Sequence, residues 1–216
     1  YNDCWPTSNW SIIDYYRNPK PAYYAAKRAC APLLPIIFER SGRVEFLFSN
    51  HTMEDVEVEF VYGQETLQGT NVWHRKSKHT IQANSSFIFD CMHRKALNIS
   101  KGDFLYIDAV ANRKKLQRVI YFTDGWKDID WPLPKIKIEI IGQRLTGSEW
   151  QTKLKVKTDA FARMCHIVYT GKDKDVFFSD NYFDLSSGSE HEIYVSSSQK
   201  IDLKDLRVGH FLTEPV

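Results

Sequence analysis

The sequence lacks several features that would assign a function at once. No apolar run approaches the roughly 20 residues that a membrane-spanning helix needs. It contains neither a glycine-rich phosphate loop nor a Gly-x-Ser-x-Gly serine elbow. The formal net charge is only +2. So small an excess of positive charge gives no reason to expect nucleic acid or a membrane surface as a partner.

Cysteine is also scarce, with four residues at wide spacing: Cys4, Cys30, Cys91 and Cys165. This is not the dense pattern of a domain stabilised by disulfides, so we expect buried free thiols. A Cys4–Cys30 bridge stays open, because the sequence does not supply the geometry that a disulfide needs.

The seven histidines raise the question of a metal site. The candidate groups are Cys91-Met92-His93, Cys165-His166, and the pair His74 and His79. None has the repeated close spacing of a zinc site. We therefore expect structural or surface histidines and no bound metal.

The length of 216 residues exceeds the roughly 100–150 residues of one typical domain and indicates two. Short segments in which apolar and charged residues alternate fill residues 33–124 and again residues 135–216. A period of two is typical of strands with one buried and one wet face. We therefore predict a mostly β protein with two consecutive β-sandwiches, joined by a Trp- and Pro-rich linker over residues 125–134.

The first 32 residues have a different pattern. Residues 1–18 hold aromatic and polar side chains without alternation, which predicts a loop. Pro19 and Pro21 favour a helix start, the alanine-rich stretch 22–31 continues it, and Pro32 ends it. Because this helix is apolar nearly all round, it should need burial on more than one side. We expect the first 32 residues to pack against the first sandwich or a neighbouring copy.

Two motifs carry the strongest signal. The first reads Asn-Asp-Cys-Trp-Pro at residues 2–6, Trp-Ser at 10–11, Asp-Tyr-Tyr at 14–16 and Lys-Pro-Ala-Tyr-Tyr at 20–24. It resembles the segment after the last barrel strand in family 2 glycoside hydrolases of the β-mannosidase and exo-β-glucosaminidase type. The second motif, Ser-Asp-Asn-Tyr-Phe at residues 179–183, is similar to part of their last immunoglobulin-like domain.

The second motif also has a physical interpretation of its own. Asp180 and Asn181 suit a turn in which each side chain bonds nearby backbone. The apolar residues that follow, Tyr182, Phe183 and Leu185, can then enter the core of a sandwich.

The resemblance implies a fold and a role. Residues 1–32 would be the tail of a (β/α)8 catalytic barrel, a loop plus its last helix, followed by two immunoglobulin-like β-sandwiches. The resembled enzymes cleave with retention, using two carboxylates about 5–5.5 Å apart. Both are glutamates on earlier barrel strands, and one follows an asparagine, whereas this sequence has no Asn-Glu pair.

We therefore expect the non-catalytic C-terminal accessory portion of a retaining exo-β-glycosidase, the parent enzyme, that acts on terminal β-mannosides or related β-linked sugars. Its partner would be the parent's catalytic barrel, and such acid–base and nucleophilic chemistry implies no cofactor. No catalytic residue is expected in the chain itself.

Two residues of the first motif are candidates for the rim of the parent's sugar pocket, because the resembled loop borders that pocket. Trp5 could cover the apolar face of a sugar ring, or could simply pack the loop onto the barrel together with Trp10. Asp3 is the second candidate, although a loop aspartate more often orients the local backbone through hydrogen bonds.

Two alternative functions stay open. A carbohydrate-binding module would use exposed aromatic side chains, for which the candidates are Trp73, Trp126, Trp131 and Trp150. A purely structural or interaction domain pair would leave residues 1–32 as an ordinary extension. A lysine stripe on two strands is most simply a solvated face, but it could meet an acidic glycan; its members are Lys137, Lys153, Lys155 and Lys157.

Overall fold

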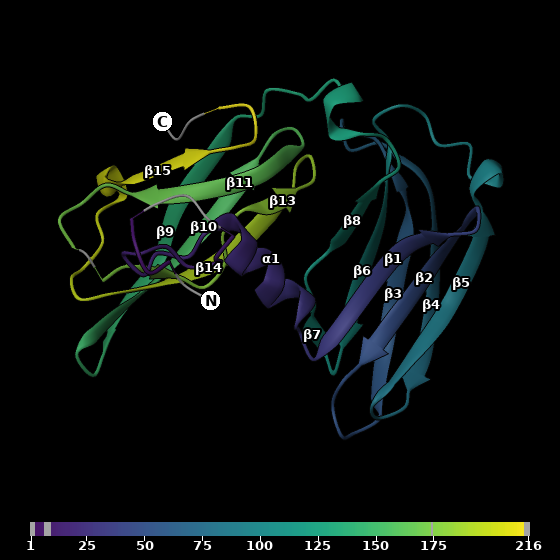
Figure 1. The fold of residues 1–216 in the computed structure, drawn as a ribbon, viewed down its shortest axis with the longest axis horizontal. Coiled ribbons are helices and arrows are strands. Elements are labelled where there is room, and N and C mark those ends of the chain that lie inside the picture. The colour runs from purple at the N-terminus through teal and green to yellow at the C-terminus, as the bar shows by residue number, and fades with distance from the viewer. Residues whose placement is uncertain (1–2, 7–9, 174, 214–216) are drawn as a thin grey trace. The chain divides into compact units, whose positions relative to one another are not determined.

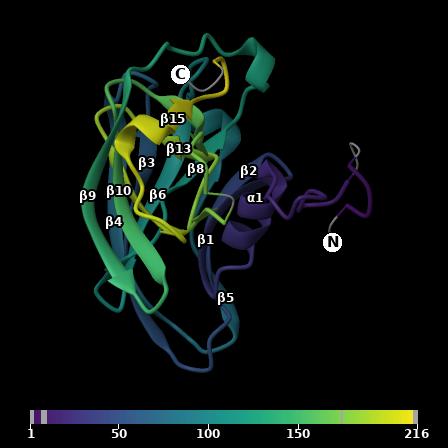
Figure 2. The same ribbon diagram turned by 90° about the vertical axis from the view of Figure 1, so that its left-hand side faces the viewer.

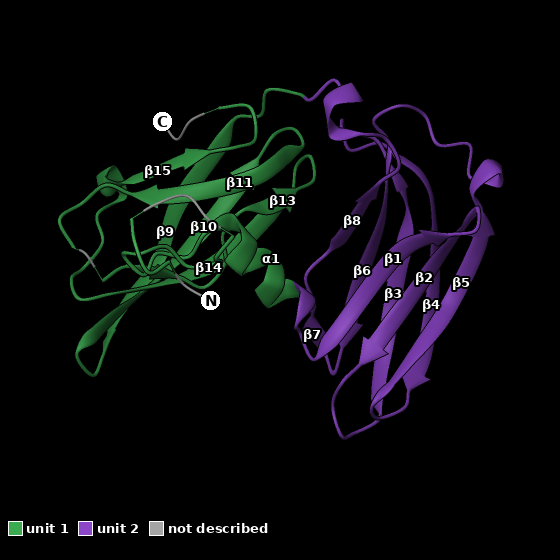
Figure 3. Cartoon of the chain, in the orientation of Figure 1, with its two compact units in different colours: residues 1–28, 132–216 green, residues 29–131 purple. Residues whose placement is uncertain are grey.

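The computed structural model describes residues 3–6, 10–173 and 175–213. The chain divides into two compact units, residues 29–131 and residues 1–28 with 132–216 (Figure 3). The first of these contains the sandwich formed by the middle of the chain, here called the first sandwich. The other contains the N-terminal segment and the second sandwich. Within the described ranges, no helix has the length and apolarity to cross a membrane.

One α-helix precedes the strands. Helix α1 spans Pro21–Ala29, so it begins at the expected proline and ends two residues before the expected boundary. Its buried residue is Tyr24, and most of its other side chains face solvent. Residues up to Arg28 belong to the compact unit of the second sandwich. The expectation that this segment packs against the first sandwich is therefore wrong. Helix α1 instead contacts the second motif, at Asp180 and Tyr182.

The first sandwich is built from two antiparallel sheets (Figure 1). A three-stranded sheet has the order β1-β2-β5, with bounds Leu33–Arg40, Arg43–Asn50 and Ser85–His93. A five-stranded sheet has the order β4-β3-β6-β7, and β8 also pairs with β6. Its strands span Val56–Glu65 (β3), Asn71–Ile81 (β4), Phe104–Ala111 (β6), Lys114–Lys115 (β7) and Val119–Phe122 (β8). Short 3-10 helices follow at Arg94–Ala96 and Trp126–Asp128.

Aromatic rings dominate the interior of the first sandwich. Phe46, Phe48 and Phe60 are at most 1% exposed. The ring of Phe60 lies parallel to that of Phe89 with the centroids 4.1 Å apart, and Tyr62 meets Phe89 edge-on at 5.1 Å. Offset and edge-to-face contacts of this kind are the arrangements that aromatic pairs prefer.

The second sandwich also has two antiparallel sheets. The order β12-β14-β10-β9 forms a four-stranded sheet, with bounds Phe177–Phe178, Glu190–Ser197, Glu149–Thr158 and Ile136–Thr146. The order β13-β11-β15 forms the other, with bounds Phe183–Leu185, Ala162–Tyr169 and Leu206–Gly209. A 3-10 helix at Leu203–Asp205 precedes β15. The long strands β9 and β10 run side by side in both views (Figure 2).

The core of the second sandwich is mostly aliphatic. Leu154, Val156, Ile193 and Val195 of the four-stranded sheet are completely buried, and they form one cluster with residues of the facing sheet such as Ile167. Alternating residues of each strand point into this cluster, as the period of two predicts. The prediction of a mostly β protein with sandwich-like sheets is confirmed.

Two strands depart from the alternating pattern on which the prediction of strands was based. Strand β4 carries polar residues on most positions, and only its last residue, Ile81, is fully buried, so no alternation marks it. Strand β1 contains Pro35, which has no N–H for a sheet ladder. The proline is tolerated because β1 lies at the edge of its sheet.

Candidate functional site

The N-terminal segment is organised around Asp3. Its side chain is 2% exposed, accepts a hydrogen bond from Ser11 Oγ at 2.6 Å and pairs with Lys20 Nζ at 2.7 Å. Lys20 Nζ also donates to Ser11 Oγ at 3.0 Å. A buried carboxylate is stable only when it is paired and hydrogen-bonded. This network therefore fixes the shape of the segment, which is the local orienting role that loop aspartates usually have.

Trp5, the other rim candidate, is 75% exposed, and Trp10 is fully exposed. Tyr16 of the same motif is 69% exposed. A run of large aromatic side chains that face solvent is typical of a surface that meets a ligand or another domain. Asp3 thus lies inside the network with Ser11 and Lys20, whereas Trp5 lies in solvent.

Helix α1 is tied to the second motif by Arg28, in its last turn. The guanidinium donates from one nitrogen to Asp180 Oδ1 at 2.7 Å and to the carbonyl oxygen of Asn181 at 3.0 Å. Its other terminal nitrogen donates to the carbonyl oxygen of Tyr182 at 3.0 Å. A planar guanidinium with several fixed donors suits such a group of acceptors. The two motifs recognised in the sequence are therefore joined in space.

Neighbouring contacts extend this junction. Lys27 Nζ donates to the carbonyl oxygen of Ser179 at 2.6 Å. The ring of Tyr24 lies 6.0 Å from that of Tyr182, and the ring of Tyr23 lies 6.3 Å from that of Phe177. Burial raises the pKa of Tyr24 well above its ordinary value of 10.0, so its hydroxyl stays protonated. The junction combines charge-assisted hydrogen bonds with ring packing.

Asn181 occupies the centre of the turn and is 5% exposed. Its Oδ1 accepts from the backbone N–H of Ile167 at 2.8 Å, and its Nδ2 donates to the carbonyl of Ile167 at 2.9 Å. The same Oδ1 accepts from the N–H of Tyr182 at 3.0 Å. The amide side chain thus supplies β11 with the donor and the acceptor that a neighbouring strand would provide. The prediction that Asp180 and Asn181 form a self-bonded turn is confirmed.

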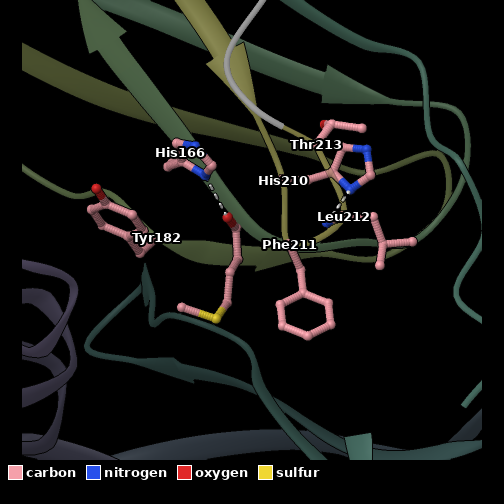
Figure 4. Close-up of a pocket in the computed structure, with 7 residues that line it drawn as sticks. His166, Tyr182, His210, Phe211, Leu212 and Thr213 are labelled. Atoms are coloured by element: carbon pink, nitrogen blue, oxygen red, sulfur yellow. Dashed lines mark hydrogen bonds between the residues drawn. The ribbon is translucent and has the colours of Figure 1, made fainter. Parts of the chain in front are cut away.

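A pocket of about 410 Å³ opens beside this turn (Figure 4). Three segments of the second sandwich contribute to it, namely β11, the second motif and the residues after β15. Its lining consists of Met164, His166, Tyr182, His210, Phe211, Leu212 and Thr213. Phe183 and Leu185 enter the core as predicted, but Tyr182 does not. Its ring is half-buried and stacks on His166, with 5.2 Å between centroids and 14° between planes.

Two of the lining residues have the left-handed backbone that side chains rarely adopt. Met164 has a φ of 48° and Tyr182 a φ of 54°. Each such residue costs about 1–3 kcal/mol and persists only where its surroundings hold it. Met164 is held by Asp184 Oδ1, which accepts from its N–H at 2.9 Å, and by His166 Nδ1, 3.1 Å from its carbonyl. Tyr182 is held in the same way by Asn181 and Arg28.

Hydrogen bonds fix the tautomers of the two pocket histidines. Because the carbonyl of Met164 can only accept, Nδ1 of His166 carries a proton, which leaves Nε2 as an acceptor when the ring is neutral. Nδ1 of His210 accepts from the N–H of Leu212 at 3.4 Å, so its proton lies on Nε2. Burial and the nearby His166 lower the pKa of His210 below its ordinary 6.5. His210 is therefore neutral at pH 7.

Within the described part of the chain, the four candidate tryptophans do not form one aromatic platform, although Trp126 and Trp131 are bonded to each other. Trp73 lies on β4, Trp131 donates to the carbonyl of Trp126, and Trp150 lies on β10 of the other unit. Three of the four lysines of the stripe pair with glutamates: Lys153 with Glu192, Lys155 with Glu190 and Lys157 with Glu139. Such pairing fits a solvated strand face better than a surface for acidic glycans.

Cysteine exposure differs from the expectation. Cys4, Cys30 and Cys91 are exposed free thiols, because they lie in the N-terminal segment, after α1 and on an outward position of β5. Only Cys165 is buried, and burial raises the pKa of its thiol to about 12. Among the described residues, no three His, Cys, Asp or Glu side chains gather as metal ligands would. His166, considered in the sequence only as a metal candidate, lies in the pocket instead.

Sequence reasoning missed most of the pocket. No pattern marked His210, Phe211 or Met164, since they come from segments far apart in the chain and become neighbours only through strand pairing. The pairing of β11 with β15 places His166 opposite Gly209, next to His210. The one available signal was the second motif, whose tyrosine was assigned to the core.

Comparisons with known proteins define the class of the second sandwich first. Residues 132–211 match the model of the Ig_mannosidase family, described as an Ig-fold domain. Over 226 aligned residues, the chain is 26% identical to β-mannosidase B of Thermothelomyces thermophilus. This alignment covers 92% of this chain and 25% of that protein. A stretch of 32 residues is 59% identical to β-mannosidase B of Emericella nidulans.

Solved structures agree on the fold. The β-D-mannosidase of Dictyoglomus thermophilum superposes with a TM-score of 0.80 at 23% identity, over 97% of this chain and 25% of that one. The exo-chitosanase of Amycolatopsis orientalis has a TM-score of 0.73 at 16% identity, over 100% and 29%. The chain thus spans about a quarter of the length of its relatives. The resemblance to the C-terminal region of family 2 glycoside hydrolases of the β-mannosidase type is confirmed, and the chain is related to that region.

Proposed function

We propose that this chain is the non-catalytic accessory portion of a retaining exo-β-glycosidase that acts on terminal β-mannosides or related β-linked sugars. Residues 1–32 are the end of its catalytic barrel, a loop plus the last helix. Residues 33–124 and 135–216 are immunoglobulin-like sandwiches, and residues 125–134 link them. The names of the relatives support this assignment, since those that align with the chain include β-mannosidases of about four times its length.

One observation carries the proposal: the junction between α1 and the second motif. In the proposed enzyme, α1 is part of the barrel, and Arg28 anchors it to the turn of the last sandwich through three hydrogen bonds. The second sandwich therefore acts as a brace for the barrel's final helix. The exposed indole of Trp10, also from the first motif, is part of the surface on which the rest of the barrel packs.

Within this enzyme, Asp3 and Trp5 lie at the rim of the sugar pocket. Asp3 acts through the network with Ser11 and Lys20, which sets the shape of the loop. Trp5 presents an exposed indole that can cover the apolar face of a terminal sugar. In the parent enzyme, Trp5→Ala should then raise KM more than Trp10→Ala does, because only the first ring touches substrate.

Two experiments test the proposal. The reading frame upstream of Tyr1 should encode a (β/α)8 domain with two catalytic glutamates, and an unrelated domain or a stop codon there would overturn the assignment. The purified 216-residue chain should not hydrolyse p-nitrophenyl β-mannoside or p-nitrophenyl β-glucosaminide above background. Turnover at ordinary enzyme rates, which lie around 1–1,000 per second, would show that the chain carries its own catalytic pair.

A further inference from the structure

We propose that the pocket formed by His166, Tyr182, His210 and Phe211 binds a neutral saccharide. The space of about 410 Å³ lies within the range of about 300–1,000 Å³ that small-molecule sites occupy. It is built entirely within the second sandwich, from β11, the second motif and the residues that follow β15 (Figure 4). This inference does not depend on the proposed role of the chain as a brace.

The charge of the pocket indicates a neutral ligand. None of the seven lining residues is an aspartate, glutamate, lysine or arginine. The charges next to the lining residues are paired: Arg163 with Asp184, which accepts from the N–H of Met164, and Arg28 with Asp180. A charged ligand would lose its hydration here without gaining a counter-charge. His210, held neutral by its burial, adds no positive charge at pH 7.

The hydrogen-bonding groups indicate a ligand rich in hydroxyls. The tautomers described above give one acceptor, Nε2 of His166, and one donor, Nε2 of His210. Thr213 adds a hydroxyl that can donate and accept. A purely apolar ligand would cover these groups without bonding them, which is unfavourable. Vicinal hydroxyls, which donate and accept within a short distance, fit them.

The pocket also presents apolar surface, which fits the C–H face of a sugar ring. Phe211 is 45% exposed and Leu212 46% exposed, although both line the pocket. Sugar rings have an apolar face of C–H groups as well as hydroxyls at their edge. Phe211 offers a surface for that face, while the histidines and Thr213 meet the edge. A single pyranose thus uses both kinds of surface that the pocket presents.

The pocket is also held in one shape before any ligand arrives. Its two left-handed residues, Met164 and Tyr182, are each fixed by a side-chain hydrogen bond on the N–H and another on the carbonyl. Held strain of this kind is concentrated at ligand sites, because a fixed site loses less conformational freedom on binding. The strain is independent evidence that these residues do more than close a turn.

Titration of the ¹⁵N-labelled chain with methyl β-D-mannopyranoside and methyl β-D-glucopyranoside tests the proposal, with amide shifts read by NMR. At least one glycoside should shift residues 164–166, 182 and 209–213 saturably, with a Kd on the order of 1 mM for a ligand of this size. Glucuronate and cyclohexanol, as charged and apolar probes of similar ring size, should bind at least about tenfold more weakly. Equal binding of either probe would overturn the assignment to a neutral saccharide.

Amino-acid substitutions test whether the glycoside binds in this pocket. Phe211→Ala should weaken glycoside binding by about tenfold or more. Tyr194→Ala, an aromatic of similar exposure on β14 outside the pocket, should leave it unchanged. If the spectrum of Phe211→Ala shows unfolding, His166→Gln serves as the second variant with the same expectation. The proposal fails if no glycoside shifts the pocket residues up to about 100 mM, if shifts centre on Trp73 or Trp150, or if the pocket variants bind normally.

Discussion

The two sandwiches share a two-sheet architecture, but their cores contain different kinds of residue. In the first, stacked and edge-on aromatic rings fill the space between the sheets, with Phe60 and Phe89 only 4.1 Å apart at their centroids. In the second, aliphatic residues such as Leu154 and Ile193 fill the core. Polar side chains complete its three-stranded sheet, where Asn181 bonds β11. The pocket lies where this sheet depends on side chains for its hydrogen bonds, beside Asn181.

The largest expected effect tests the aromatic interior. Phe60→Ala should lower the free energy of unfolding of the first sandwich by about 3–5 kcal/mol, because it removes a buried ring and leaves a cavity among the others. Urea unfolding followed by amide exchange would resolve the strands of this sandwich. Ile193→Ala is the matched change in the aliphatic core, with about 2–5 kcal/mol expected. A loss below about 1 kcal/mol for Phe60→Ala would show that the rings do not form a packed core.

The second effect concerns a buried asparagine that each sandwich contains. Asn50 is fully buried and donates to three backbone carbonyls, those of Glu54, Ile81 and Gln82. Asn181 bonds both backbone groups of Ile167. Replacing either by alanine leaves buried backbone groups unpaired and should cost about 1–3 kcal/mol in urea unfolding.

The two asparagine variants should differ most in the NMR signals of the pocket residues. Asn181→Ala should also shift the NMR signals of Tyr182 and His166, whereas Asn50→Ala should not, because only Asn181 holds the left-handed turn. Gln199→Ala, at an exposed position, is the control and should stay within about 0.5 kcal/mol of the wild type. If Asn181→Ala lost no more stability than Gln199→Ala, the Asn181 amide would not replace the hydrogen bonds that a neighbouring strand would give to β11.

These two asparagines show where prediction from sequence succeeds and where it stops. The turn at Asp180 and Asn181 was predictable, because the bonds involved are local. The bonds to Ile167 were not, because they depend on a strand fourteen residues away in the chain. The alternating strands were predictable from their period of two, but β4 was hidden by its polar faces. The pocket joins three separate segments and depends on pairing register, which no local pattern contains.

The third prediction compares two arginines, each of which forms an ion pair with an aspartate. Arg28 reaches Asp180 and two backbone carbonyls, and its side chain is 27% exposed. Arg75 pairs with Asp90 of the first sandwich, and its side chain is 56% exposed. Arg28→Met should cost about 1–2 kcal/mol and speed proteolysis of α1, because several charge-assisted bonds are lost. Arg75→Met should cost at most about 1 kcal/mol, as surface pairs do. Equal effects would mean that the junction is no stronger than a surface ion pair.

The smallest effect is a pH dependence confined to the second sandwich. The pKa of His210 is lowered by burial and by its neighbour His166, so the folded state takes up this proton less readily than the unfolded state, whose pKa is about 6.5. The contribution of His210 to stability is therefore complete above pH 6.5 and decreases as the pH falls from 6.5 toward the lowered value. Urea unfolding between pH 7 and 5 should show this slope for the wild type and a flatter curve for His210→Gln. Identical slopes would mean that His210 is as free to protonate in the folded pocket as in the unfolded chain, and the pocket would then not be the neutral site that its hydrogen bonds describe.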